Sequence, residues 1–140
     1  MTVQAFTVYP TKKYNRTPPP STIALHGLDS LSSPIQIHNH RFFHPAKGAI
    51  SDIVNNLKSS LAEALELYPP VAGTVIANEL GEPCVAMDAE HISGTPFLVD
   101  VKDTPYTGDS EDLSPRTDVI LPPLSSTLAV KVTQVNDQYH

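Results

Sequence analysis

The chain has 140 residues, of which 40% are hydrophobic and 17% are charged, and its formal net charge is −6. This length predicts one domain, residues 1–140, with a workable hydrophobic core. The negative charge and the lack of a Lys/Arg run argue against a nucleic-acid-binding protein. No stretch approaches 18 consecutive apolar residues, so we expect no membrane span.

The amino terminus and the cysteine usage indicate the compartment. The first residues lack a basic region followed by an apolar core, the pattern of a secretory signal peptide. Cys84 is the only cysteine, so it cannot form an internal disulfide, and a buried inert thiol is the simplest interpretation. We therefore expect a cytoplasmic protein with no covalently bound cofactor.

The first 43 residues predict two strands joined by loops. Residues 3–8 alternate loosely between apolar and polar side chains, which favours a strand that Pro10 closes. Residues 11–21 are polar and proline-rich and predict a loop, and residues 22–32 predict a short connector that ends in turn residues. Residues 35–43 predict the second strand.

A long amphipathic helix is predicted over residues 49–68. Its apolar positions follow a 3.6-residue period and form one stripe: Ile53, Val54, Leu57, Leu61, Ala64, Leu65 and Tyr68. Ser51 is the predicted N-cap, and Asp52 falls in the first turn. Pro69 and Pro70 cannot continue the helix, and Gly73 allows the backbone to bend where a side chain would obstruct it.

After the helix, the pattern predicts only strands and loops. The predicted strands are residues 71–77, 83–87, 95–101, 119–121 and 127–135. A hairpin turn is predicted at residues 78–81, because Asn and Gly tolerate turn dihedrals, and an acidic loop at residues 103–118. Short strands around one long helix predict an α/β fold in which the helix packs on a mixed β-sheet.

The last predicted strand, residues 127–135, alternates well enough for the middle of a sheet but has no later strand to pair with. An unpaired sheet edge invites pairing with another strand. We therefore expect association with a complementary carboxyl-terminal lobe or a homo-oligomer.

Several motifs occur in an order that resembles a known family. They are LKSSLAEAL…YPPVAG at residues 57–73, IQIHNHRFFHP at residues 35–45, Gly81-Glu82-Pro83 followed by Val85, LPPL at residues 121–124 and LAVKVT at residues 128–133. Leu28-Asp29 followed by Leu31-Ser32 adds a short connector of the same type. Together these motifs resemble the amino-terminal lobe of the BAHD acyltransferases, which move an acyl group from coenzyme A to an alcohol or amine.

The resemblance implies one lobe of the two-lobed fold typified by chloramphenicol acetyltransferase. It also implies acyl transfer from acyl-CoA, as co-substrate, to a hydroxyl or amine of a small molecule of secondary metabolism. Yet no histidine is followed by aspartate at the fourth position, so the family's catalytic His-x-x-x-Asp motif is absent. Its Asp-Phe-Gly-Trp-Gly motif is absent as well, since the chain has no tryptophan. We therefore expect an apparently truncated lobe that needs a second lobe for activity.

The predicted strand at residues 35–43 carries the candidate site. Gln36, His38, His40 and Phe42 share one face by two-residue alternation. The resemblance places this strand beside the acceptor pocket, which makes the four residues candidates for binding a small-molecule substrate and His38 and His40 candidates for a general base. The alternative interpretation is a half-exposed strand with surface histidines.

His38 and His40 also have the spacing of metal ligands on a strand, but a site needs three or four convergent ligands, so we expect no metal.

Two further functions stay open beside acyl transfer. The chain could be a free-standing lobe that binds a hydrophobic metabolite, or steers its reaction, through the Gln36/His38/His40 face. It could also be a docking partner that uses its unpaired sheet edge without a ligand. Whether the chain is an enzyme on its own stays open at this point.

Overall fold

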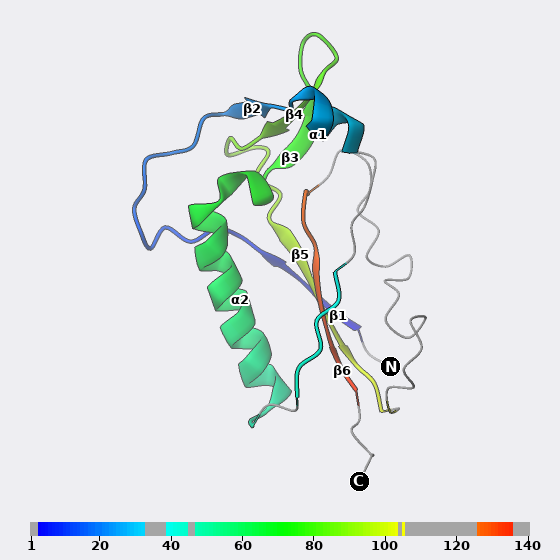
Figure 1. Cartoon of the computed structure of the whole chain (residues 1–140). Helices are drawn as coiled ribbons and strands as arrows, with labels where there is room; N and C mark the ends of the chain where they lie inside the picture. The colour runs from blue at the N-terminus through cyan, green and yellow to red at the C-terminus, as the bar shows by residue number, and fades with distance from the viewer. Residues whose placement is uncertain (1–2, 33–38, 45–46, 104, 106–125, 136–140) are drawn as a thin grey trace.

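The computed structural model describes residues 3–32, 39–44, 47–103, 105 and 126–135. This part of the chain is mixed α/β, with one long helix and two three-stranded sheets (Figure 1). The sequence predicted a helix packed on a mixed sheet, and the structure confirms that class but divides the strands between two sheets. The predicted strand at 119–121, most of the acidic loop and residues 35–38 lie outside the described residues.

Sheet 1 contains β1 (Val3–Val8), β5 (Thr95–Val101) and β6 (Val130–Gln134), with β5 in the centre. β1 runs antiparallel to β5, and β6 runs parallel to it, so this sheet is mixed as predicted. β6 pairs with β5 alone in the described part and forms an edge of sheet 1, rather than its middle. A partner for its outer edge stays a prediction.

Sheet 2 contains β2 (Thr22–Ala24), β4 (Pro83–Ala86) and β3 (Thr74–Ala77), all antiparallel. The predicted hairpin between β3 and β4 is confirmed: the Asn78 N–H donates to the Glu82 carbonyl at 2.8 Å, and Gly81 adopts a φ of 78°. The prediction for residues 22–32 was wrong, because they form β2 and the short helix α1 (Gly27–Ser32). Elements this short contain too few residues for a periodic pattern.

The long helix α2 spans Ile50–Leu67, with Ala49 and Tyr68 as its capping residues, so the predicted range is confirmed. Asp52 lies in the first turn as expected, but the predicted N-cap Ser51 was wrong. Ala49 holds that position without a side-chain hydrogen bond, because the helix has already begun at Ile50, one residue before Ser51.

The helix ends at the double proline, and the chain then reverses into sheet 2. Residues Pro69–Val71 form a single 3₁₀ turn, η1, so β3 begins at Thr74 rather than at the predicted residue 71. A Cβ on Gly73 would lie 2.7 Å from the Ala86 carbonyl oxygen. This close approach confirms that a side chain would obstruct the bend.

The hydrophobic core lies between α2 and one face of sheet 1 (Figure 1). Its buried members are Val8, Val54, Leu65, Ala72, Phe97 and Val99. Phe6, Ile50, Leu61, Ala62, Val130 and Val132 pack against them while partly buried. Cys84 lies outside this cluster and is buried as predicted, with 4% of its surface exposed.

The buried face of α2 differs from the predicted stripe. Leu57 is 43% exposed and Tyr68 66% exposed, and Ala64 is exposed as well. Val54 and Leu65 are buried as predicted, and Leu61 packs against the core. Next to the exposed Leu57, however, Lys58 is half-buried, which the pattern missed because it counts lysine as polar. A lysine can bury its aliphatic stem while its ammonium finds a favourable contact, so an inward lysine does not break the face.

Candidate functional site

Only part of the site predicted on residues 35–43 lies among the described residues. Gln36 and His38 lie outside the described residues. His40 and Phe42 lie in residues 39–44, which adopt neither helix nor strand, and both side chains are exposed. The alternation that placed His40 and Phe42 on one strand face therefore does not apply to them, and this part of the prediction was wrong.

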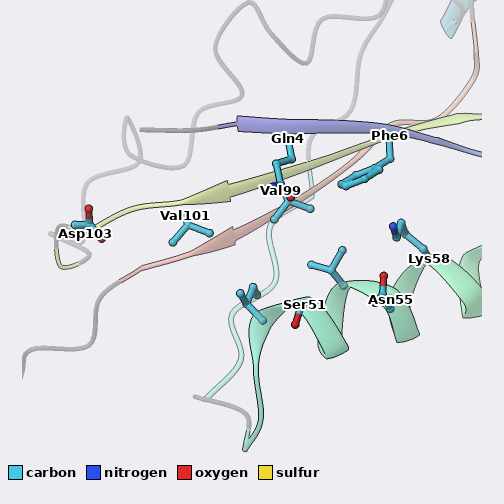
Figure 2. A pocket seen from close by; sticks show the side chains of 10 residues that line it. Gln4, Phe6, Ser51, Asn55, Lys58, Val99, Val101 and Asp103 are labelled. Carbon is cyan, nitrogen blue, oxygen red and sulfur yellow. The ribbon is translucent and has the colours of Figure 1, made fainter.

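A groove of about 470 Å³ lies between the amino-terminal half of α2 and strands β1 and β5 (Figure 2). This volume falls in the range of small-molecule sites in proteins. The lining residues are Gln4, Phe6, Ile50, Ser51, Val54, Asn55, Lys58, Val99, Val101 and Asp103. His40 and Phe42 are not among them.

Regular backbone geometry places these side chains together. Gln4 pairs with Val99 across the β1–β5 ladder, so the two project from the same face of sheet 1. On the facing helix, Ile50, Val54 and Lys58 follow one another at steps of four residues and form one row. The groove is thus built by three elements that are far apart in the sequence.

Lys58 is the unusual member of this row. Its ammonium lies 3.9 Å from the centre of the Phe6 ring, and the side chain is half-buried. Figure 2 shows the lysine reaching from α2 toward that ring. The negative face of an aromatic ring attracts a cation, with a contribution of about 0.5–2 kcal/mol. The contact explains how a charged side chain can occupy the inward face of the helix.

A second polar cluster closes the turn between β4 and β5. The two carboxylate oxygens of Asp88 each lie 2.8 Å from His91 Nδ1, and Oδ1 also accepts from the Glu90 backbone N–H at 2.9 Å. The hydrogen bond from His91 holds the pKa of Asp88 below its usual value. The Thr74 hydroxyl donates to the His91 carbonyl, which ties this turn to β3. The pair orients an imidazole, but it does not line the groove.

A third cluster fastens the loop after β1 to the outer side of α2. Glu66 accepts from the Thr11 hydroxyl at 2.6 Å and from the Tyr14 N–H at 2.9 Å. Glu63 accepts from Lys13 Nζ and from the Tyr14 hydroxyl, both at 2.8 Å. These two donors hold the pKa of Glu63 below its usual value. The cluster is exposed and positions a loop, so we assign it a structural role.

The opposite face of sheet 1 carries a buried charge. Asp100 is 3% exposed, and its Oδ2 lies 3.7 Å from Lys131 Nζ. Its Oδ1 accepts no hydrogen bond from the residues that the structure describes. No group of three or more His, Cys, Asp or Glu side chains that could hold a metal ion occurs among the described residues. The expected lack of a metal stays a prediction.

Comparison with known proteins gives the family. The model of the Transferase family, which represents the BAHD acyltransferase domain, matches residues 2–137. The chain belongs to this family. The match spans nearly all of the sequence and confirms the resemblance that the motifs indicated. A search of curated proteins returned no match.

Membership of the BAHD family supports an acyltransferase-type function.

The groove beside Lys58 was not predicted from the sequence, although the sequence contains a signal for it. Lys58 stands four residues after Val54 and seven before Leu65, in register with the buried row of α2. None of the helices in the described part is long and apolar enough to cross a bilayer.

Proposed function

We propose that this BAHD-family chain is one lobe of an acyltransferase that moves an acyl group from acyl-CoA to a hydroxyl or amine of a small metabolite of secondary metabolism. The observation that carries the proposal is the family match over residues 2–137. In this proposal, the two sheets and α2 form one lobe of a two-lobed fold like that of chloramphenicol acetyltransferase.

The reaction sets chemical requirements. The acceptor oxygen or nitrogen attacks the thioester carbonyl carbon, and a base removes the proton from the acceptor. The carbonyl oxygen carries negative charge until the carbon–sulfur bond breaks, so hydrogen-bond donors must surround it. Coenzyme A leaves as the thiol after its sulfur takes up a proton. A lobe contributes to this reaction by shaping a water-poor channel in which the two substrates meet.

A complementary lobe supplies the base in this proposal. None of the six histidines in the chain has the His-x-x-x-Asp spacing. His40 is exposed, and the Nδ1 of His91 is engaged by Asp88. The complementary lobe, in the same polypeptide or another, would therefore carry the general base and close the acceptor pocket. For turnover by this chain alone, His38 and His40 would be the first residues to test.

The proposal can be tested with acetyl-CoA that carries an isotopic label in the acetyl group. The purified chain would be incubated with a mixed panel of alcohols and amines, both alone and with a carboxyl-terminal BAHD lobe that contains the motif. We expect labelled ester or amide only when both lobes are present. Lack of label from a folded two-lobe complex with all acceptors would oppose the proposed reaction.

A further inference from the structure

The groove contains a lysine, Lys58, that forms no ion pair within the described residues. Lys58 lies on the inward row of α2, while its neighbour Leu57 is 43% exposed. A rotation by one residue would place the leucine inward and the lysine in water, which burial alone would favour. No ion pair joins Lys58 to a carboxylate in the part of the chain that the structure describes. The Phe6 ring is its one contact of electrostatic character there.

The contact with the Phe6 ring does not occupy all the N–H donors of the Lys58 ammonium. A lysine ammonium has three N–H donors, and an aromatic face approaches it from one direction only. The remaining donors need oxygen acceptors, from water or from a ligand. Gln4 and Asn55 also line the groove and supply amide groups that can donate hydrogen bonds to a ligand.

Apolar side chains line the middle of the groove. Val54 is buried, and Val99 and Val101 form the opposite wall from β5. Figure 2 shows Lys58 at one end of the groove and Asp103 at the other, with the valines between them. A ligand that fits this pattern has an anionic group at one end and an apolar body.

The charge balance selects the kind of anion. Lys58 is the one lysine among the lining residues of the groove and provides a single positive charge. A phosphate dianion would require more cations or a row of backbone N–H donors. A monovalent carboxylate needs only one cation and a few hydrogen bonds.

We infer that this groove binds a small organic carboxylate with an apolar body, whose carboxylate pairs with Lys58 and whose body lies against Val54, Val99 and Val101. The inference does not depend on the proposed acyl transfer, because it uses neither a histidine nor a second lobe.

Binding would be measured by NMR titration of the isotopically labelled chain with butanoate, hexanoate and octanoate, and with the alcohols of the same lengths. Each added methylene should tighten binding by about fourfold until the groove is filled. The carboxylates should bind on the order of tenfold more tightly than the alcohols, and added salt should narrow that gap. Signals of Gln4, Asn55 and Val99 should shift.

Lys58→Met keeps most of the aliphatic stem and removes the charge, and Lys12→Met is the matched control, because Lys12 is an exposed lysine outside the groove. We expect Lys58→Met to weaken carboxylate binding on the order of tenfold and to leave alcohol binding unchanged. The control should bind both as the wild type does. The wild-type titration decides the question even if Lys58→Met does not fold.

Two results would overturn the inference. One is wild-type chain that binds no carboxylate or does not distinguish the carboxylates from the alcohols. The other is a set of shifts outside the groove, which would place the ligand elsewhere. Retained carboxylate affinity in folded Lys58→Met would also refute the role of the lysine.

Discussion

Replacing Leu65 by alanine tests which face of α2 is buried. Leu65 is 1% exposed and belongs to the core cluster with Phe97 and Val99. The substitution removes buried apolar atoms and leaves a cavity that the strands of sheet 1 can fill only in part. Buried leucines in this situation lose about 2–5 kcal/mol of unfolding free energy on truncation. We expect Leu65→Ala to fall in that range.

The same helix provides matched controls. Leu57 is 43% exposed, so Leu57→Ala should change the unfolding free energy by no more than about 0.5–1 kcal/mol. Leu61 is half-buried beside the core, so Leu61→Ala should cost an intermediate amount, about 1–3 kcal/mol. The sequence pattern alone treats the three leucines as equivalent.

Urea unfolding followed by circular dichroism would measure all three variants, with free energies compared at a common slope. The order Leu65, Leu61, Leu57, from most to least destabilising, is the expected outcome. Equal losses at Leu57 and Leu65 would show that Leu57 is buried, as the predicted stripe has it, and would contradict its exposed position in the structure. The inward position of Lys58 would then be refuted as well.

Two further predictions concern a glycine and an ion pair. Gly73→Ala should cost about 1–3 kcal/mol in urea unfolding, because its Cβ would meet the Ala86 carbonyl oxygen at 2.7 Å. The control is Gly27→Ala, in which the new Cβ would have open space around it. This control should leave the unfolding free energy unchanged or raise it by up to about 1 kcal/mol. An equal loss of unfolding free energy in both variants would contradict the steric argument. Because folding lowers the pKa of Asp88 below its ordinary 3.8, its bond to His91 contributes stability above that pH and loses it as the pH falls through the folded pKa. The stability difference between the wild type and Asp88→Asn should therefore stay level from about pH 7 to about pH 5 and shrink as the pH falls below 3.8, and a difference that stays constant in that acid range would argue against this linkage.

The elements that sequence could predict are those with long local patterns. α2 was predicted over nearly its full length because an apolar period and a double proline mark its body and its end. The range of β5, Thr95–Val101, was predicted in full. The pairing of β2 with β4 could not be predicted, because it joins segments about sixty residues apart through only three residues on β2.

The candidate site was harder to predict for the same reason. The groove forms where β1, α2 and β5 lie next to one another, and no local sequence motif predicts that these three elements are neighbours. The histidine-rich run was conspicuous in the sequence, but residues 39–44 lack the strand that would align it. The inward position of Lys58 was not predicted because hydropathy patterns treat lysine as a surface residue, whereas its aliphatic stem permits an inward position.

The central claim is that this chain forms one lobe of a BAHD acyltransferase and that the base comes from a complementary lobe. The most direct measurement is the rate at which the two-lobe complex releases the coenzyme A thiol. This rate would be compared between two variants of the complex. One replaces the histidine of the motif in the complementary lobe by alanine, and the other replaces His38 and His40 of this chain by alanine. We predict that the motif change lowers the rate by about 10²–10⁴-fold, as expected for loss of a general base, while His38→Ala/His40→Ala retains most of it. Full activity after the motif change would contradict this function. A loss of activity that occurs only in the His38→Ala/His40→Ala variant would contradict it as well.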